Sequence, residues 1–417
     1  MKILHVVHGY HPSIGGSQWL VQNLSERFVQ QYGDQVTVFT TTALNMELFW
    51  DRRETALPTG VETIHGVQVR RFPVYNGFGT LRMLLAHGAH RLHLPHNDWL
   101  RTIYNGPIVF GLRRAVAESG ADVVFATAFP HLHMYDALHG ARRTGIPLVF
   151  SGAIHAPDRW GYDRPMIYRA IRQADAYIAY TPFERDYLVE RGIAPIKVAV
   201  IGVGVDAAAF AQGDGRSVRR QYGWGDDPLV ALVAKQSPRK RFDLLVEAMA
   251  SVWQAHPEAQ LLLAGARTSY SEQIRAAIAR LPPRQQARVT LLDDFPEALK
   301  PDLLAASDIF VLPSGQESFG IAFLEAWASG TPVIGCRSGA ISSVIDEGRD
   351  GLLVPYGDAG ALAAAIVELL DDPNRRTEMG RAGRHKVLAN YTWEIIARRV
   401  RAVYERAIAG RAADRST

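Results

Sequence analysis

Short apolar runs of β type alternate with longer segments of helical periodicity along almost the whole chain, and the alternation occurs as two series. The first series begins at the N-terminus, and the second begins after about residue 200. Strands separated by helices favour parallel βαβ units, in which helices cover both faces of a sheet. The sequence therefore predicts an α/β protein with two Rossmann-like domains.

The predicted elements fall into these two series. Those of the first are Ile3–Val7, Ser17–Gln31, Gln35–Thr41, Val123–Ala126 and Leu148–Ser151. Those of the second are Leu229–Ala234, Phe242–His256, Gln260–Ala264, Val289–Leu292, Ile309–Pro313 and Pro332–Gly335. Residues 44–120 are less regular, and we expect them to form an insertion with one or two helices that determines specificity.

The length of 417 residues also favours two domains, and an apolar fraction of 47% provides material for two cores. A polar, glycine-bearing stretch at 211–227 follows a turn at 202–206, so we place the linker near 195–215. The predicted domains are 1–200 and 201–391. The single cysteine, Cys336, excludes an internal disulfide and is expected at a buried strand end.

Charge and hydropathy restrict the partners and the location of the chain. Residues 1–200 hold 20 Lys and Arg against 16 Asp and Glu, which suits an anionic substrate or membrane surface better than nucleic acid. The N-terminus lacks a secretory pattern, and no apolar run is long enough to span a bilayer. We therefore expect a cytoplasmic protein, either free or held peripherally at the inner face of the membrane.

Gly15 and Gly16 lie between the first strand and a helix that Ser17 is expected to cap. Glycines at this position let backbone N–H groups approach a phosphate at the positive end of the helix. A plain tight turn is the alternative. The pair also lacks the GxGxxG pattern of a dinucleotide-binding domain, which disfavours a dehydrogenase.

A cationic run follows the first strand of the second series and includes Lys235, Arg239, Lys240 and Arg241. The carboxyl edge of an open α/β sheet is where ligands bind, and cations there can neutralise a diphosphate. A solvated charged turn is the alternative for this segment.

The segment from Pro313 to Gly330 predicts a strand end followed by a helix that Ser318 caps and Gly330 closes. The amides of Phe319, Gly320 and Ile321 would then form an anion site at the helix N-terminus.

Two carboxylates belong to the same segment. Glu325 lies among apolar helical residues and needs hydrogen-bond donors, which sugar or ribose hydroxyls would provide. Glu317 precedes the helix and is expected to face the same cleft. The alternatives are that Glu317 only complements the helix dipole and that Glu325 pairs with a nearby cation.

His155 follows a predicted strand of the first domain and is a candidate hydrogen-bond donor, acid or base, with a structural histidine as the alternative. His131 and His133 are weaker candidates of the same kind.

Together these segments resemble glycosyltransferase family 4, a large retaining group with the GT-B fold, over nearly the whole chain. Glu317-Ser318-Phe319-Gly320-Ile321, with Glu325 eight residues after Glu317, is similar to the family's E-x7-E motif. The resemblance implies that Glu317 binds the donor sugar and that Glu325 binds the ribose hydroxyls. It also implies that the amides of the motif bind the diphosphate.

Other segments add to the resemblance. Lys240 matches a family lysine, whereas Lys235 stands where the family has an arginine and so lacks the planar fork for bidentate phosphate binding. The glycine pair at 15–16 is similar to the family's N-terminal glycine loop, and His155 is similar to a histidine near the donor sugar. The family's final helix, at 392–417 here, returns to pack on the first domain.

The resemblance implies two domains that face each other across a cleft, the first for the acceptor and the second for the donor. It implies retaining transfer of a sugar from a UDP- or GDP-sugar to a glycan, a lipid-linked acceptor or a small molecule in envelope polysaccharide or glycolipid synthesis. The chain has no Asp-x-Asp pattern, so we expect no metal and no cofactor. The alternatives are a sugar-nucleotide epimerase of similar fold and an inactive nucleotide-sugar-binding protein.

One basic and aromatic stretch, Thr80–Ile108, is a candidate contact with anionic lipid or a carrier pyrophosphate. A surface helix and loop without this role is the alternative.

Overall fold

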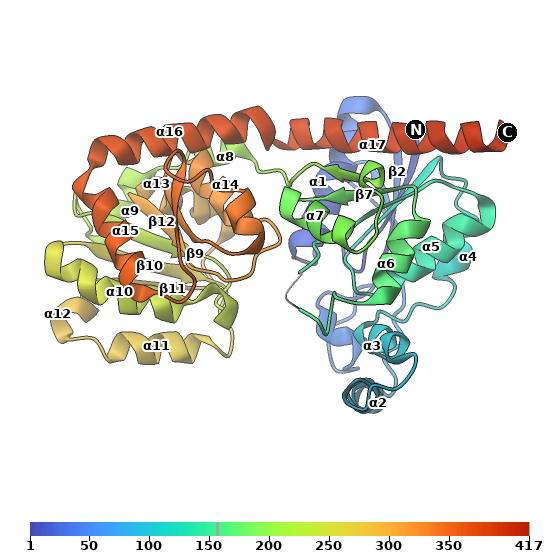
Figure 1. Ribbon diagram of the computed structural model, residues 1–417, viewed down its shortest axis with the longest axis horizontal. Coiled ribbons are helices and arrows are strands. Elements are labelled where there is room, and N and C mark those ends of the chain that lie inside the picture. The colour runs from blue at the N-terminus through green and yellow to red at the C-terminus, as the bar shows by residue number, and fades with distance from the viewer. Residues whose placement is uncertain (156–157, 417) are drawn as a thin grey trace. The chain divides into compact units, whose positions relative to one another are not determined.

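The computed structural model describes residues 1–155 and 158–416, which divide into two compact units (Figure 1). Unit 1 comprises Met1–Gly202 and Ile396–Thr417, and unit 2 comprises Val203–Ile395. Each unit contains one sheet and is described separately.

Unit 1 is built on an eight-stranded sheet in the order β3-β4-β2-β1-β5-β6-β7-β8. Its neighbouring strands are parallel except for the antiparallel pair β3 and β4. The strands are β1 (Lys2–Val6), β2 (Gln35–Thr41), β3 (Gly60–Ile64), β4 (Val67–Phe72), β5 (Val123–Thr127), β6 (Leu148–Ser151), β7 (Ala176–Ala179) and β8 (Val198–Val200). The helices are α1 (Gly16–Tyr32), α2 (Gly79–Arg91), α3 (Asn97–Asn105), α4 (Leu112–Ala117), α5 (His133–Thr144), α6 (Pro165–Gln173) and α7 (Pro182–Glu190).

Unit 2 is built on a six-stranded sheet in the order β11-β10-β9-β12-β13-β14, and its paired strands are parallel. The strands are β9 (Leu229–Val233), β10 (Gln260–Gly265), β11 (Val289–Asp293), β12 (Ile309–Leu312), β13 (Val333–Cys336) and β14 (Gly351–Val354). The helices are α8 (Ala207–Ala211), α9 (Gly215–Tyr222), α10 (Phe242–Ala255), α11 (Ser271–Ala279), α12 (Pro283–Gln286), α13 (Lys300–Ala306), α14 (Ile321–Ala328), α15 (Ala359–Asp371) and α16 (Pro373–Asn390).

The central strands are buried on both faces, which explains why they are continuous apolar runs without polar alternation. Every residue of β5 and β9 is buried. The two mainly parallel sheets, each with its own helices, confirm the predicted pair of Rossmann-like α/β domains. Cys336, the last residue of β13, is also buried as expected, and burial raises the pKa of its thiol to about 11.

The last helix, α17 (Trp393–Ser416), packs on unit 1 from Ile396 onward, as predicted. Arg401 Nε lies 3.0 Å from Asp34 Oδ2, and the hydroxyl of Tyr404 lies 3.1 Å from Nε2 of the buried His5. The helix is anchored because its apolar stripe is buried as well, at positions Ile396, Val400 and Val403.

Residues 44–120 differ from the predicted insertion. They add β3 and β4 to one edge of the unit 1 sheet and contain three α-helices, α2, α3 and α4, instead of one or two. The hairpin of β3 and β4 is short and partly exposed at the sheet edge, so it lacks the long apolar run that marks a central strand.

Candidate functional site

The chain order of the unit 2 strands reverses between β9 and β12, which are neighbours in the sheet. In this 3-2-1-4-5-6 order the switch point lies between these two strands, and open α/β sheets bind ligands at the carboxyl ends of the strands at such a point. The cationic run that includes Lys240 follows β9, and the segment that contains Glu317 follows β12. The fold therefore brings two of the predicted motifs to one place.

Lys240 and Glu317 form a buried ion pair at this edge of the sheet. Lys240 Nζ donates to Glu317 Oε1 at 2.6 Å, and the two side chains are only 13% and 8% exposed. Burial raises the pKa of Glu317, but the charges of Lys240 and Arg239 outweigh this effect and hold the pKa below its ordinary value. Glu317 is therefore an ionised carboxylate at neutral pH.

Tight turns position both partners. Lys240 closes a short 3-10 turn, Pro238–Lys240, in which its amide donates to the carbonyl of Ser237 at 2.9 Å. On the other side, Ser338 Oγ donates to the carbonyl of Gly315 at 2.7 Å. A Cβ atom at Gly315 would lie 2.6 Å from the Tyr356 ring, so the loop before Glu317 packs closely against Tyr356.

The helix after Glu317 begins later than predicted. α14 starts at Ile321 with Gly320 as its N-cap, and no side chain caps it, so the predicted cap by Ser318 is wrong. Gly320 has a φ of 94°, a left-handed conformation that glycine adopts without strain. Of the predicted amides only that of Ile321 belongs to the helix, because Phe319 and Gly320 precede it.

Glu325 lies on α14 and is almost fully buried. Lys300, the first residue of α13, donates to Glu325 Oε1 at 2.9 Å and also contacts Glu297 at 3.0 Å. Burial lowers the pKa of Lys300, but Glu325 and Glu297 raise it more, so the net pKa is above its ordinary value. Glu325 therefore pairs with a nearby cation, as the alternative for this residue had it.

Lys235 is not part of the ion pair. It is exposed, and across residues 1–155 and 158–416 it has no ion-pair partner. Its neighbour Gln236 is buried instead, donating to Asp293 Oδ1 at 2.7 Å and to the Gly265 carbonyl at 3.3 Å. Gln236 thereby ties the loop after β9 to the ends of β10 and β11 and leaves Lys235 facing solvent.

Gly15 and Gly16 of unit 1 follow β1. Gly15 is the N-cap of α1, which begins at Gly16 without a side-chain cap, so the predicted cap by Ser17 is wrong. A Cβ atom at Gly15 would lie 2.5 Å from Gln18 Oε1, whereas one at Gly16 would meet nothing within 4 Å. Gly16 therefore leaves open space at the start of the helix.

His155 follows β6 and is half-buried, with its ring 5.1 Å from the ring of Tyr162. The buried Glu184 holds the preceding residue by accepting from the amide of Ile154 at 3.1 Å. His155 and the glycine pair thus lie at the same carboxyl edge of the unit 1 sheet, because both follow parallel strands.

His131 and His133 lie after β5, next to His8, which follows β1. The rings of His8 and His131 are 4.8 Å apart, and His133 Nε2 lies 2.8 Å from the Thr127 carbonyl. Burial lowers the pKa of all three, that of His133 to about 3, so they are neutral at pH 7. Across the described residues 1–155 and 158–416, no group of three or more His, Cys, Asp or Glu is placed to hold a metal ion.

Two stretches that together span most of the chain match known families. Residues 14–209 match the family described as Glycosyltransferase Family 4, and residues 215–386 match Glycosyl transferases group 1. A D-inositol 3-phosphate glycosyltransferase of Acidothermus cellulolyticus is 30% identical over 328 residues, 70% of this chain and 71% of that relative. The chain belongs to glycosyltransferase family 4.

Two other relatives of this family 4 chain align over less of their length. A GDP-mannose-dependent monoacylated alpha-(1-6)-phosphatidylinositol monomannoside mannosyltransferase of Corynebacterium glutamicum is 36% identical over 208 residues, 47% of this chain and 53% of the relative. A D-inositol 3-phosphate glycosyltransferase of Kribbella flavida is 32% identical over 259 residues, which are 59% of this chain and 60% of the relative. The chain spans between half and two thirds of the length of these two.

Solved structures show that the family 4 fold is shared along the chain. Sucrose-phosphate synthase from Thermosynechococcus elongatus has a TM-score of 0.74 at 23% identity, over 98% of this chain and 99% of that one. Anabaena HepE in complex with UDP and glucose has a TM-score of 0.70 at 19% identity, over 97% of this chain and 99% of that one. These likenesses confirm the predicted fold class, GT-B.

A cavity of about 750 Å³ in unit 2 of the family 4 chain is separate from this site. Its lining includes Gln260, the first residue of β10, together with Trp224 and Arg288. It therefore lies at the amino ends of the strands, opposite the edge that carries Lys240 and Glu317.

Proposed function

We propose that this family 4 member is a retaining glycosyltransferase that moves a sugar from a UDP- or GDP-sugar to a glycan, a lipid-linked acceptor or a small molecule. The observation that carries the proposal is the buried ion pair of Lys240 and Glu317 beside the N-terminus of α14. A cation, a carboxylate and helix amides together offer partners for a diphosphate and for sugar hydroxyls. The proposal includes a role in envelope polysaccharide or glycolipid synthesis and a peripheral contact with anionic membrane.

Similar proteins that use or bind nucleotides and sugars support a nucleotide-sugar donor. The Corynebacterium glutamicum relative is GDP-mannose-dependent, and the Anabaena structure contains UDP and glucose. In the proposed site Glu317 accepts from sugar hydroxyls and Glu325 from ribose hydroxyls. Lys300 donates to one oxygen of Glu325, and Lys240 donates to one oxygen of Glu317.

In the proposed reaction the bond between the anomeric carbon and the diphosphate oxygen breaks, and a bond from the acceptor oxygen to that carbon forms on the same face. Negative charge develops on the nucleoside diphosphate as it takes the electron pair of the broken bond, and its oxygen takes the proton that the acceptor hydroxyl loses. Lys235, Lys240 and the amide of Ile321 stabilise that charge without a metal ion. Gly15, Gly16 and His155 contact the donor from unit 1 in this proposal.

A donor screen tests the proposal. The protein is incubated with UDP-, GDP- and ADP-sugars, with and without acceptors of the three classes, and release of nucleoside diphosphate is measured. We expect release with a UDP- or GDP-sugar that rises when the acceptor is present and persists in EDTA. Failure to bind any nucleotide sugar would refute the function, and dependence on a divalent ion would refute the metal-free stabilisation.

A further inference from the structure

The faces of α2 are inverted relative to an ordinary surface helix. Arg82, Ala86 and Ala89 are buried against unit 1, and Arg82 Nη2 donates to the carbonyl of Phe49 at 2.6 Å. The opposite face is apolar and faces solvent, with Leu81, Leu84 and Leu85 exposed by 51%, 61% and 50%. A globular protein normally turns the apolar stripe of a helix inward. Packing within unit 1 therefore does not explain why these leucines face solvent.

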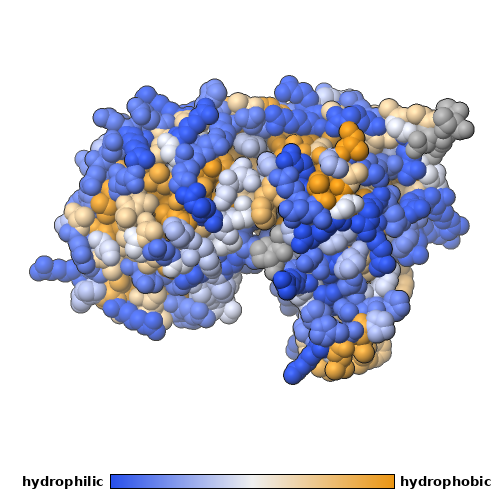
Figure 2. All heavy atoms as spheres, in the orientation of Figure 1, coloured by the Kyte–Doolittle hydropathy of each residue, from blue (hydrophilic) through white to orange (hydrophobic). Residues whose placement is uncertain are grey.

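The exposed apolar surface extends beyond the helix. Phe78, just before α2, is 72% exposed, and Leu92, just after it, is 69% exposed. Figure 2 shows a hydrophobic area at the tip of unit 1, where Figure 1 labels α2. Single exposed apolar residues are common, but a contiguous patch of this kind marks an interaction surface. We call Phe78, Leu81, Leu84, Leu85 and Leu92 the α2 patch.

Two exposed arginines, Arg52 and Arg91, lie beside the α2 patch. No acidic residue occurs between Glu62 and Asp98. Arg52 lies beside the start of the helix, since its Nη2 would be 3.2 Å from a Cβ atom at Gly77. Arg52 and Arg91 are exposed, and neither has an ion-pair partner in residues 1–155 and 158–416. The surroundings of the patch therefore attract anions.

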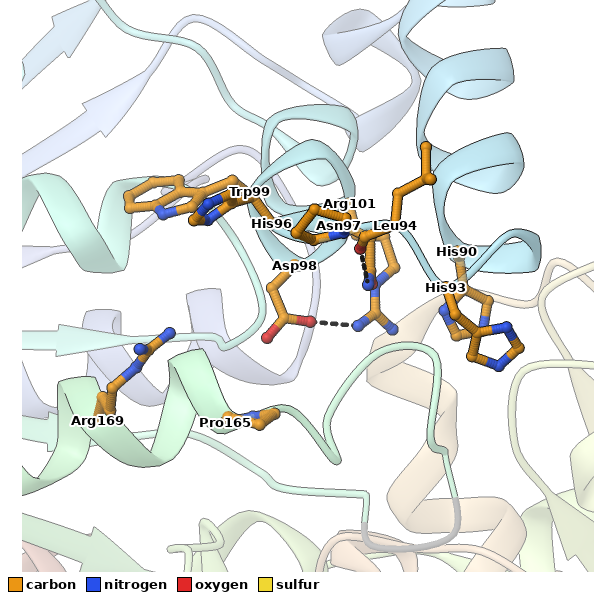
Figure 3. Close-up of a pocket in the computed structure, with 11 residues that line it drawn as sticks. His90, His93, Leu94, His96, Asn97, Asp98, Trp99, Arg101, Pro165 and Arg169 are labelled. Atoms are coloured by element: carbon orange, nitrogen blue, oxygen red, sulfur yellow. Dashed lines mark hydrogen bonds and ion pairs between the residues drawn. The ribbon is translucent and has the colours of Figure 1, made fainter.

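A pocket of about 410 Å³ adjoins the patch (Figure 3). It lies between the connection from α2 to α3 and the start of α6, and Leu94 and Trp99 supply apolar walls. Its one acidic residue, Asp98, forms an ion pair with Arg101. Arg169 lines the side contributed by α6, is exposed, and has no ion-pair partner among the described residues. The pocket thus offers an uncompensated cation next to apolar surface.

We propose that the α2 patch lies in the interface of a bilayer that contains anionic phospholipid, with a headgroup phosphate held in the pocket beside Arg169. Leucines and a phenylalanine would enter the acyl boundary, while the arginines would contact headgroups. A second copy of the chain is a poorer occupant, because a symmetric contact through this patch would bring two cationic rims together. This proposal rests on the proposed function, because a lipid-linked acceptor would reach the enzyme from the membrane at this surface.

The test measures binding of the whole protein to sedimented vesicles without any donor, so it is independent of sugar transfer. Vesicles of phosphatidylcholine alone are compared with vesicles of phosphatidylcholine and phosphatidylglycerol at low and high salt. We expect salt-sensitive binding to the anionic vesicles. The Leu84→Ser/Leu85→Ser variant should lose about tenfold or more in partitioning, because each leucine loses its apolar burial.

Matched controls keep the result interpretable. Ile196→Ser changes a 95% exposed residue elsewhere in unit 1 and should bind like the wild type. The Arg91→Gln/Arg169→Gln variant should lose about tenfold or more of the anionic-vesicle binding only. Thermal unfolding of all variants should match the wild type, since the replaced side chains are exposed. No binding to anionic vesicles, equal binding by Leu84→Ser/Leu85→Ser, or a dimer that this variant dissociates would each overturn the proposal.

Discussion

Lys240 Nζ lies 2.6 Å from Glu317 Oε1, although 77 positions separate the two residues in the chain. They meet because β9 and β12 are adjacent in the sheet and both carry their loops at the carboxyl edge. The pair is buried, so each charge depends on the other for compensation. This dependence makes the pair testable without any substrate.

Replacing Lys240 by methionine should destabilise unit 2, because Glu317 would remain buried without its cation. We expect the free energy of unfolding, measured in urea, to fall by about 3 kcal/mol. The Lys240→Met/Glu317→Gln variant removes both charges and should recover most of the loss. A single variant as stable as the wild type would show that the pair is open to solvent.

The pH dependence of stability should follow the lowered pKa of Glu317. Because its folded pKa is below the unfolded value, the ionised carboxylate stabilises the fold at pH values above the unfolded pKa. That contribution is lost as the pH falls through the folded pKa. The difference in free energy of unfolding between the wild type and Glu317→Gln should therefore shrink on acidification, and a difference that grows instead would contradict the assignment.

The start of α14 leaves no room for a side chain at Gly320. Gly320→Ala places a Cβ atom 2.6 Å from the Phe323 ring at a φ of 94°. Gly330→Ala, at a φ of 84° with nothing within 4 Å, is the matched control for backbone strain alone. Gly330→Ala should cost about 1 kcal/mol and Gly320→Ala about 2 kcal/mol more. Equal melting temperatures for the two variants would mean that Phe323 moves freely.

The central strands could be predicted from sequence because parallel strands buried on both faces are continuous apolar runs. β6 lies at Leu148–Ser151 as predicted, and β2 at Gln35–Thr41. The helix starts were harder, because Ser17 and Ser318 suggest caps while Gly15 and Gly320 provide them. A glycine N-cap leaves no side-chain pattern for sequence reasoning to detect.

The partners in the site could be predicted only in part. Lys240 and Glu317 could be placed at one edge because each follows a predicted strand and the carboxyl ends of parallel strands share an edge. In contrast, nothing in the sequence around Lys300 indicates that it contacts Glu325, 25 residues away. The only signal was that a carboxylate in an apolar helix requires a donor. The exposed face of α2 was equally hidden, because its leucines have the helical spacing of a buried stripe.

Glu325 should contribute to donor affinity more than to turnover. Glu325→Gln removes an acceptor charge for ribose hydroxyls, and we expect the Kd of the nucleoside diphosphate to rise about tenfold. Glu297→Gln, which alters the other carboxylate bound by Lys300, is the control and should bind normally. Unchanged affinity in Glu325→Gln would limit this residue to pairing with Lys300.

One measurement tests directly whether Glu317 is part of the donor site. Release of nucleoside diphosphate from the preferred donor is compared for the wild type, for Glu317→Gln and for Glu347→Gln, which changes an exposed carboxylate paired with Arg337. We predict that turnover falls about 100-fold or more in Glu317→Gln, while Glu347→Gln retains the wild-type rate. Unchanged release by Glu317→Gln would contradict the site.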